Sequence, residues 1–279
     1  MEPMPSISRG STDDPTVEGF GLEWTTYDQF DRDPASLRRS FDRYFVGFPW
    51  QDLAPGARGL DVGSGSGRWA ALVTERDLDV VALDASLDAL AVTSRRLPGA
   101  GVVNGSAVEL PFADGSFDFG FSLGVLHHLP DTDGALREIQ RVLRPGAPFL
   151  VYLYYAFDNR PAWFRSMWRV SDLVRRRVAA SSPRVRLRIT RLIAATVYWP
   201  LSRVALVLER TGRNVESFPL SGYRNQPYYV LQTDALDRFG TRLEKRYTRD
   251  QIRSMLSAAG FSDIEFNEDW PFWCAVARA

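Results

Sequence analysis

Three alternating glycines follow an apolar segment that carries one aspartate, in the run Leu60-Asp61-Val62-Gly63-Ser64-Gly65-Ser66-Gly67. Glycine is favoured where the backbone takes a positive φ or must approach a ligand with no Cβ in the way. The segment from Trp69 to Val73 is predicted to continue as a helix whose first N–H groups face the turn. The run therefore predicts a strand, a tight turn and a helix that together hold a nucleotide-like ligand. Taken alone, the motif also fits a flexible surface loop.

The spacing of the glycines distinguishes two kinds of ligand. A dinucleotide fingerprint has the pattern G-x-G-x-x-G, with a pyrophosphate at the helix N-terminus. Here Gly67 comes one position early, and Asp61 stands just before the turn. A carboxylate at that place repels a pyrophosphate but attracts the ammonium group of an amino acid. A nicotinamide-dependent oxidoreductase is therefore the weakest of the functions considered.

Predicted strands and helices alternate at short intervals from Leu60 to Tyr155, which is typical of parallel β-α-β units with both sheet faces covered. The segment Asp79–Asp84 is apolar and ends in an acid, so it is predicted as the second strand. The carboxylate of Asp84 has acceptor oxygens for both hydroxyls of a ribose. Ligands of such sheets bind at the carboxyl ends of the strands, where we expect to find Gly63, Asp84, Ser106 and Ser122.

Five segments occur in a characteristic order: the turn 61–67, the strand 79–84, the stretch 104–112, the stretch 116–129 and the helix end and Pro-Gly turn 141–147. In this order they resemble class I S-adenosylmethionine-dependent methyltransferases, in particular the small-molecule "methyltransferase type 11"-like domain. The resemblance covers roughly Leu53 to Tyr155 and, more loosely, the last thirty residues. It implies an α/β fold with a Rossmann-like, doubly wound, mostly parallel seven-stranded sheet. It also implies an antiparallel C-terminal strand, closing strands at 264–266 and 272–277, and an α-helical insertion.

The resemblance implies S-adenosyl-L-methionine as cofactor and S-adenosyl-L-homocysteine as product. The residues that it assigns to the cofactor follow the predicted strands: Asp61, Gly63, Ser64, Gly65, Gly67, Asp84, Ala85, Ser106, Ala107, Ser122 and Leu123. Many relatives have Asp where Ser106 stands, so adenine contacts here are expected to rely more on the N–H of Ala107. Trp24, Tyr27 or Gln29 of an N-terminal segment is expected to cover the methionine end, and plain packing of a helix is the alternative.

Composition narrows the class of protein. A chain of 279 residues with 45% hydrophobic residues can bury a sizeable core, and its formal net charge of zero disfavours a general polyanion binder. The single cysteine, Cys274, lies in an apolar run and is predicted to be buried. No cluster of metal ligands is expected. The first sixteen residues lack an apolar signal segment, which predicts a cytoplasmic protein.

The predicted organisation has five parts. Residues 1–16 form a disordered tail, 17–50 an N-terminal helical cap, 51–155 the cofactor-binding core, 156–245 a mainly helical arginine-rich insertion, and 246–279 the last helix and the closing strands. Thr248 is the expected N-cap of that last helix, which is predicted to end at Gly260.

The insertion is strongly basic. Between Arg160 and Arg210 the chain has twelve arginines and two acidic residues, a formal charge of +10 that leaves −10 for the rest. The apolar run Leu192–Leu208 is interrupted by Pro200 and Arg203, so a transmembrane helix is disfavoured. One hypothesis is a peripheral contact with the inner membrane face, which Arg175, Arg176 and Arg177 would strengthen. The alternatives are a lid over the acceptor or a homodimer interface.

Methyl transfer requires orientation and exclusion of water, with a base only where the acceptor is weakly acidic. His127 and His128 are the only histidines, and they are candidates for that base or for orienting their loop. Tyr223, Tyr228 and Tyr229 are candidate acceptor contacts or packing residues. The predicted acceptor is a small molecule, a glycan or a lipid-linked compound, methylated at oxygen.

Nucleic acid is disfavoured as the acceptor. The chain has Ser122-Leu123-Gly124-Val125 where amino-methyltransferases of nucleic acids have an Asn/Asp-Pro-Pro-aromatic run. Two other functions stay open on the sequence alone. One is a membrane-associated binding protein that keeps the fold without transferring a methyl group, and the other is an enzyme that binds the cofactor but catalyses a different reaction.

Overall fold

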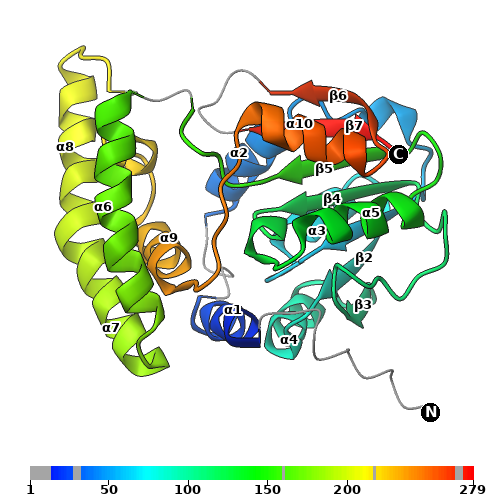
Figure 1. Cartoon of the computed structure of the whole chain (residues 1–279), viewed down its shortest axis with the longest axis horizontal. Helices are drawn as coiled ribbons and strands as arrows, with labels where there is room; N and C mark the ends of the chain where they lie inside the picture. Colours follow the sequence, from blue (N-terminus) through cyan, green and yellow to red (C-terminus); the bar gives the residue numbers. More distant parts are fainter. Residues whose placement is uncertain (1–13, 28–32, 159–160, 216–217, 268–272) are drawn as a thin grey trace. The chain divides into compact units, whose positions relative to one another are not determined.

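A computed structural model of the chain describes residues 14–27, 33–158, 161–215, 218–267 and 273–279 (Figure 1). The chain divides into two compact units. The first, here called the core unit, contains residues 1–29, 37–158 and 243–279, and the second, the helical unit, contains residues 30–36 and 159–242. Each unit is described separately.

The core unit is built on one seven-stranded sheet with the order β3-β2-β1-β4-β5-β7-β6. All its pairings are parallel except those of β7, which is antiparallel to both β5 and β6. The predicted fold class is therefore confirmed. The strands are β1 (Arg58–Val62), β2 (Asp79–Asp84), β3 (Gly101–Asn104), β4 (Phe119–Leu123), β5 (Pro148–Tyr152), β6 (Ser262–Phe266) and β7 (Cys274–Arg278).

Helices cover the sheet and begin where capping residues permit. Ser86, Asp131 and Thr248 each accept a backbone N–H at a helix start. Thr248 is the predicted N-cap of the last helix, and it also forms a reciprocal capping box with Gln251. The helices of the core unit are α1 (Asp14–Thr26), α2 (Pro34–Tyr44, which begins in the helical unit), α3 (Arg68–Thr74), α4 (Leu87–Arg96), α5 (Thr132–Val142) and α10 (Arg249–Ala258), with the 3₁₀ turns η1 (Trp50–Asp52) and η2 (Leu126–His128).

Alternate residues of the strands are buried on opposite faces of the sheet. Leu60, Val62 and Leu83 pack with residues of α5 and α10 in one hydrophobic cluster. Phe119 and Phe121 pack with residues of α2 and α3 in another. Because successive side chains of a strand point to opposite faces, the near-continuous apolar strands are explained by burial on both sides. Cys274 is buried in β7, as predicted.

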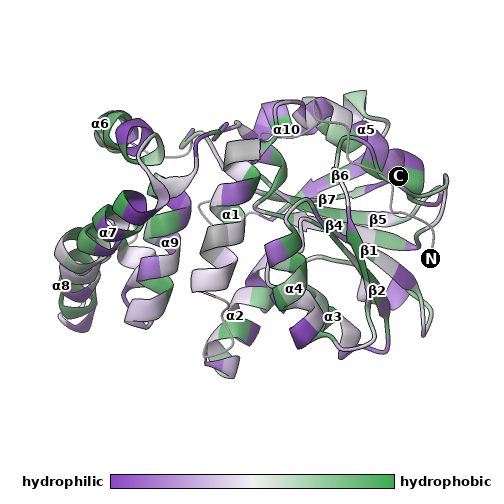
Figure 2. Cartoon of the chain, turned by 90° about the horizontal axis from the view of Figure 1, so that it is seen from below, coloured by the Kyte–Doolittle hydropathy of each residue, from purple (hydrophilic) through white to green (hydrophobic). Residues whose placement is uncertain are grey.

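The helical unit contains α6 (Ala162–Ala179), α7 (Pro183–Ile193), the π-helical turn η3 (Ala194–Tyr198), α8 (Trp199–Arg210), η4 (Ser221–Tyr223) and α9 (Tyr228–Gly240). Its own apolar cluster includes Ala194, Tyr198, Leu231 and Phe239. Figure 2 shows both green and purple residues along α6, α7 and α8.

Pro200 lies inside a long helix and does not end it. Residues Pro183–Arg210 form one continuous helix of 28 residues, which in the described part of the chain is the one helix long and apolar enough to cross a membrane. Proline lacks an N–H and crowds the carbonyl of the preceding turn, which normally kinks a helix. Here the π-helical turn η3 ends at Tyr198, two residues before Pro200, and π-helical turns are among the irregularities that accompany such positions in a helix. Length and hydropathy alone are weak grounds for a membrane span.

The prediction that Arg175 faces a membrane was wrong, whereas the side chain of Arg176 is 71% exposed. Arg175 is buried, and its Nε donates to Asp172 Oδ1 at 2.6 Å while its Nη1 donates to the carbonyl of Thr241 at 2.8 Å. Arg176 pairs with the other carboxylate oxygen of Asp172 at 2.8 Å. Arg175 therefore joins α6 to the end of α9 within the unit. Of the three arginines, Arg177 is exposed and makes no ion pair among the described residues.

We predict that Gly59→Ala destabilises the core unit, because a Cβ at this position of β1 would lie 2.1 Å from the Phe119 ring. Overpacking of this kind costs about 1–3 kcal/mol, measurable as a lower midpoint of urea unfolding. Gly101→Ala on β3 is the matched control, since its Cβ would make only ordinary contacts, 3.4 Å or more from Val81. Equal effects of the two substitutions would contradict this account of the β1–β4 contact.

Candidate functional site

The glycine turn after β1 is fastened to the neighbouring strand β2. The N–H groups of Gly63 and Ser64 both donate to the carbonyl of Leu83, at 2.7 and 3.0 Å. Gly63, Gly65 and Gly67 all have positive φ, between 55° and 81°. A Cβ on Gly63 would lie 2.4 Å from Val125, which follows β4. The turn therefore needs glycine both for its backbone conformation and for the close approach of β4.

Asp84 lies at the carboxyl end of β2 and holds the turn from the side. Its Oδ2 accepts the N–H of Gly65 at 2.9 Å, and its Oδ1 accepts the N–H of Ser86 at 2.8 Å. Burial raises the pKa of Asp84, and the hydrogen bonds from Ser86, Gly65 and Ala85 oppose this shift. A carboxylate oxygen has two lone pairs, so each oxygen of Asp84 can accept one further hydrogen bond.

Asp61 is buried inside the turn with an incomplete set of partners. Its side chain is 2% exposed, and its Oδ2 accepts no hydrogen bond from the described residues. Burial raises the pKa of this carboxyl well above its ordinary value, the nearby Asp84 raises it further, and Arg68 lowers it. Buried polar atoms are normally paired. The unpaired oxygen of Asp61 is therefore the clearest sign that a polar ligand group belongs here.

Helix α1 covers this turn. A Cβ on Gly65 would lie 2.8 Å from the indole of Trp24, so the glycine lets the ring lie directly on the turn. The guanidinium of Arg68 lies 5.0 Å from the centre of the Trp24 ring. Phe20 contacts His128 edge-on, and Tyr27 is buried just after the helix. Trp24 thus lies against the glycine turn, and a contact of Trp24 or Tyr27 with the cofactor stays a prediction, whereas Gln29 is outside the described residues.

The two histidines follow β4 in η2 and differ in their hydrogen bonds. Tyr154 N–H donates to His127 Nδ1 at 3.4 Å, which assigns the ring proton to Nε2. Burial lowers the pKa of His127 well below its ordinary value, helped by His128 and Arg246. His128 Nδ1 lies 2.6 Å from the carbonyl of Leu243 and must donate to it. In its neutral form His128 therefore has its lone pair on Nε2, the tautomer that can accept a proton.

The remaining predicted cofactor residues lie at the same edge of the sheet, but their side chains differ in availability. Asn104 Nδ2 donates to the carbonyls of Asp84 and Ala85, both at 3.0 Å, and so fixes the loop after β2. Ser122 is fully buried, and its Oγ donates to the carbonyl of Val62 at 2.9 Å. Ser122 therefore contributes to the β1–β4 junction. The others that are buried here are Ser64, Ser106, Ala107 and Leu123.

Several residues of the site were not found from the sequence. Two side chains of α4 stabilise the turn. Thr93 donates to the carbonyl of Gly65 and Arg96 donates to the carbonyl of Ser66, each at 2.8 Å. Arg68, at the start of α3, has a buried Nε without a hydrogen-bond partner in the described structure. The spacing of Thr93 and Arg96 on a predicted helix gives no signal for this role, because the contact joins segments about thirty residues apart.

A buried ion pair also lies close to the histidines. The segment 243–247 runs along the ends of β4 and β5, with Lys245 N–H donating to His127 O and Tyr247 N–H donating to Tyr154 O. Glu244 and Arg246 pair at 2.7 Å, and their side chains are only 1% and 11% exposed. Glu244 Oε2 has no hydrogen-bond partner among the described residues. This carboxylate is a second place where a polar ligand group fits.

The tyrosines proposed as acceptor contacts belong to the helical unit. Tyr223 packs against Tyr198, with ring centres 5.5 Å apart, and burial raises the pKa of Tyr223 well above its ordinary value. Tyr228 contacts the ring of Trp199 edge-on. Within their unit Tyr223 and Tyr228 act as packing residues, and an acceptor contact by either of them or by Tyr229 stays a prediction.

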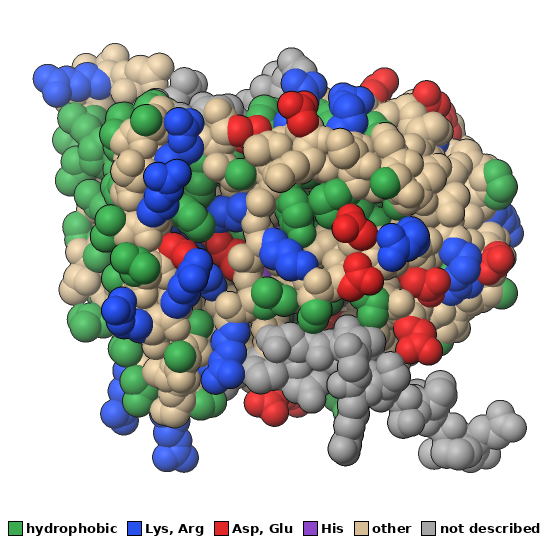
Figure 3. All heavy atoms as spheres, viewed as in Figure 1, with side chains coloured by type: hydrophobic (Ala, Val, Ile, Leu, Met, Phe, Trp, Pro, Cys, Tyr) green, Lys and Arg blue, Asp and Glu red, His purple; other side chains and the backbone are tan. Residues whose placement is uncertain are grey.

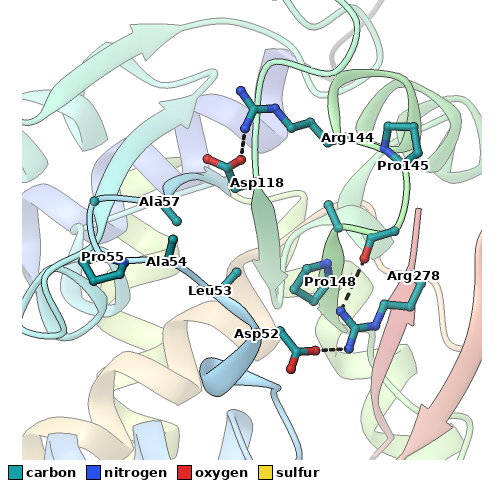
Figure 4. A pocket seen from close by; sticks show the side chains of 13 residues that line it. Asp52, Leu53, Ala54, Pro55, Ala57, Asp118, Arg144, Pro145, Pro148 and Arg278 are labelled. Atoms are coloured by element: carbon teal, nitrogen blue, oxygen red, sulfur yellow. Dashed lines mark hydrogen bonds and ion pairs between the residues drawn. The ribbon is translucent and has the colours of Figure 1, made fainter.

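A separate surface hollow of about 510 Å³ lies at the opposite, amino-terminal ends of the strands (Figure 4). It is lined by residues that include Asp118 and Arg144, which form an ion pair, and Asp52 and Arg278, which form another. Ligands of parallel sheets bind at the carboxyl ends, so this hollow is not the candidate site. No group of three or more potential metal ligands was found in the described part of the chain.

The residues at the glycine turn fit a nucleoside that carries an amino acid. Asp61 supplies an unpaired carboxylate oxygen for an ammonium group, and Arg68 supplies an unpaired N–H for a carboxylate. Asp84 lies at the end of the adjacent strand with further acceptor capacity for a ribose. A pyrophosphate would instead meet two carboxylates, those of Asp61 and Asp84, both with raised pKa.

Comparison with known proteins agrees with this geometry. Residues 60–151 match the family described as "Methyltransferase domain". A demethylmenaquinone methyltransferase of Renibacterium salmoninarum is 44% identical over 98 residues, which cover 35% of this chain and 41% of the relative. A ubiquinone/menaquinone biosynthesis C-methyltransferase of Xanthomonas oryzae pv. oryzae is 38% identical over 141 residues, which cover 47% of this chain and 54% of the relative.

The chain spans about half the length of the curated relatives it matches. The crystal structure of a possible exported protein from Bordetella parapertussis is similar with a TM-score of 0.52 and 18% identity, covering 92% of this chain and 78% of that one. This likeness concerns the fold alone. The family match confirms the predicted resemblance to S-adenosylmethionine-dependent methyltransferases and the cofactor that it implies.

We predict that binding of S-adenosylhomocysteine weakens as the pH falls through the raised pKa of Asp61, because protonation removes the charge that holds the ammonium group. Asp61→Asn should reduce the affinity about 10- to 100-fold at higher pH, since a hydrogen bond to a charged group contributes about 1.5–3 kcal/mol. The charged groups that face Asp61 are Asp84 and Arg68. Because Asn does not titrate, the substitution should also make the binding affinity less dependent on pH. Calorimetric titration over a pH series measures both effects.

The same substitution should change the stability of the ligand-free protein in the opposite direction. A carboxyl whose pKa is raised on folding stabilises the protein when protonated, and this contribution is lost as the pH rises through the raised value. Above that pH, Asp61→Asn should unfold at a higher temperature than the wild type. Asp79→Asn, whose side chain is 61% exposed at the other end of β2, is the control and should change neither property. A binding affinity unaffected by Asp61→Asn would contradict the assignment.

Proposed function

We propose that this chain, whose residues 60–151 form a class I S-adenosylmethionine-dependent methyltransferase domain, transfers a methyl group to a small-molecule acceptor. The observation that carries the proposal is the unpaired, buried carboxylate oxygen of Asp61 beside a glycine turn that Asp84 fastens. S-adenosylmethionine, when bound, supplies a methyl group on a positively charged sulfur, which a nucleophile can displace.

In this proposal the residues of the chain bind the cofactor, orient it toward the acceptor and exclude water from the site. Asp61 and Arg68 hold the amino-acid end of the cofactor, Asp84 accepts from the ribose, and the backbone near Ser106 and Ala107 contacts the base. Trp24, lying on Gly65, shields the turn from solvent. Methyl transfer needs no acid for its leaving group, so orientation and removal of water account for most of what the protein must provide.

His128 is the better candidate for a base. It has the tautomer with a proton-accepting Nε2, because Nδ1 donates to Leu243 O. His127 has the opposite tautomer and a lowered pKa, so it stays neutral, and by accepting the N–H of Tyr154 it orients the loop. A base of this kind takes a proton from a hydroxyl as its oxygen attacks the methyl group, or from a ring carbon after that carbon has accepted the methyl group.

We propose a hydroxylated acceptor that is methylated at oxygen, as the sequence suggested, with a glycan or lipid-linked compound as the wider class. A second candidate is a ring carbon of a quinone, because one relative is named a C-methyltransferase of quinone biosynthesis and another a demethylmenaquinone methyltransferase. Quinols have both a ring carbon and a phenolic oxygen. The position of the new methyl group by NMR distinguishes the two candidates.

The proposal is tested with methyl-labelled S-adenosylmethionine, the purified chain, and panels of quinols, phenols and glycans. We expect formation of S-adenosylhomocysteine and a product heavier by one methylene group. A product that changes without gaining the label would indicate a different reaction. Tight cofactor binding with no turnover on any extract would favour a binding protein that keeps the fold.

We predict that His128→Asn lowers turnover about 10²-fold or more, the usual contribution of a positioned base, and leaves the affinity for S-adenosylhomocysteine unchanged. The Asn amide keeps a donor toward Leu243 O and removes only the proton-accepting nitrogen. His127→Asn serves as the comparison and should change loop stability more than the pH profile. If His128→Asn keeps the wild-type rate and pH profile, His128 is not the base.

A further inference from the structure

The helical unit has exposed side chains that are apolar and basic on the same helices. We call this surface the arginine-flanked apolar face. Its residues, all exposed on α6 and α7, are Trp163, Met167, Val170, Leu173, Val174, Val185 and Leu192, with Arg169, Arg177, Arg184, Arg188 and Arg191 beside them. Figure 3 shows hydrophobic side chains and arginines interspersed over these two helices.

The apolar residues of α6 recur at a helical spacing. Trp163, Met167, Val170 and Val174 stand at i, i+4, i+7 and i+11, which places them on one side of the helix. They are between 42% and 65% exposed. Arg169 and Arg176 are seven residues apart and form a parallel stripe next to them. An ordinary surface helix turns its apolar side inward and its charges outward, so α6 is arranged in the opposite sense.

The interior side of α6 explains why this arrangement is stable. Asp172 and Arg175, 7% and 6% exposed, form the buried ion pair that ties α6 to Thr241. A buried pair of this kind holds the helix in one rotational position, since turning it would leave charges unpaired. The hydrophobic stripe is therefore kept outside by the polar contacts within the unit.

The long helix that follows has the same property. Val185 and Leu192 are exposed on α7, and Arg184, Arg188 and Arg191 stand at i, i+4 and i+7 beside them. In the most apolar window of Pro183–Arg210, only 22% of the residues are buried. A core helix of this hydropathy would be mostly buried. Exposed apolar side chains gathered on neighbouring helices and flanked by charged residues indicate a contact site.

Charge identifies the partner. The stretch 160–210 has twelve arginines and two acidic residues, and both acids are already paired, Asp172 with Arg175 and Arg176, and Glu209 with Arg224. Self-association through the same patch would bring two basic faces together, which is unfavourable. A surface of anionic phospholipids complements the arginines with phosphate groups and takes up the apolar side chains at the boundary of headgroups and acyl chains.

We propose that the arginine-flanked apolar face docks on the surface of an anionic lipid bilayer. The helices lie in the plane of the interface, with Trp163, Met167 and Val170 among the acyl chains and the guanidinium groups on lipid phosphates. This inference does not rest on the proposed methyl transfer, because lipid binding is measured without cofactor or acceptor.

The first test is sedimentation of the full chain with vesicles of phosphatidylcholine alone and of phosphatidylcholine mixed with phosphatidylglycerol. We expect binding to the anionic vesicles that added NaCl weakens. Arg177→Gln, Arg184→Gln and Arg188→Gln together should weaken binding at least tenfold, because each basic residue at an anionic surface contributes about fivefold. Arg39→Gln, Arg95→Gln and Arg137→Gln, exposed in the core unit, are the matched control with the same change in charge.

The second test changes the apolar residues. Trp163→Gln and Val170→Gln replace side chains that are 51% and 65% exposed, so they should leave the unfolding temperature unchanged and weaken vesicle binding. Arg175 is left intact, since its loss would remove the buried one of the two arginines that pair with Asp172.

Four results would overturn the proposal: equal binding to neutral and anionic vesicles, equal loss from the control arginines, a dimer that dissociates on Trp163→Gln and Val170→Gln, and salt-resistant, protease-protected insertion of Pro183–Arg210. The dimer would assign the face to a second copy of the chain. The protected insertion would make the long helix a membrane span.

Discussion

The carbonyl of Leu83 accepts two hydrogen bonds, from the N–H groups of Gly63 and Ser64, and the candidate site depends on this junction. It exists because β1 and β2 pair in parallel with Val62 opposite Leu83. That register places the turn next to Asp84, which then accepts the N–H of Gly65. A slip of one residue between these strands would turn Asp84 to the other face of the sheet and leave the turn unsupported. The position of the cofactor residues is thus a consequence of strand pairing, which the hydrophobic clusters on both faces stabilise.

Asp61 and Asp84 show what such a site costs the free protein. The two carboxyls lie close together beside the turn on which Trp24 packs, and burial raises the pKa of both. Removing a charge from water is unfavourable unless the charge is paired. Asp84 is compensated by backbone N–H groups, whereas one oxygen of Asp61 has no partner among the described residues. A ligand with an ammonium group would pair with the buried carboxylate of Asp61, so binding energy and folding stability are linked at this residue.

Much of the core unit could be predicted from the sequence because its determinants are local. Neighbouring residues determine the alternation of strands and helices, the acidic residue before the glycine turn and the Thr248 cap. The predicted fold class, family resemblance and cap are confirmed. The supports of the turn were missed. Thr93 and Arg96 reach it from a helix about thirty residues away, and the buried pair Glu244–Arg246 lies more than a hundred residues beyond the histidines. The burial of Arg175 was missed for the same reason, since it depends on a contact with Thr241.

The π-helical turn η3 has a consequence for how the long helix of the helical unit meets its surroundings. An i→i+5 turn accommodates one residue more than the α-helix around it, and one residue corresponds to a rotation of roughly 100°. The side chains of α8 are therefore out of phase with those of α7, although the axis continues from Pro183 to Arg210. Because of this offset, the long helix contacts α9 with one side of α7 and contacts η4 with a different side of α8. The five residues of η3 thus change the direction in which the following side chains point without interrupting the helix.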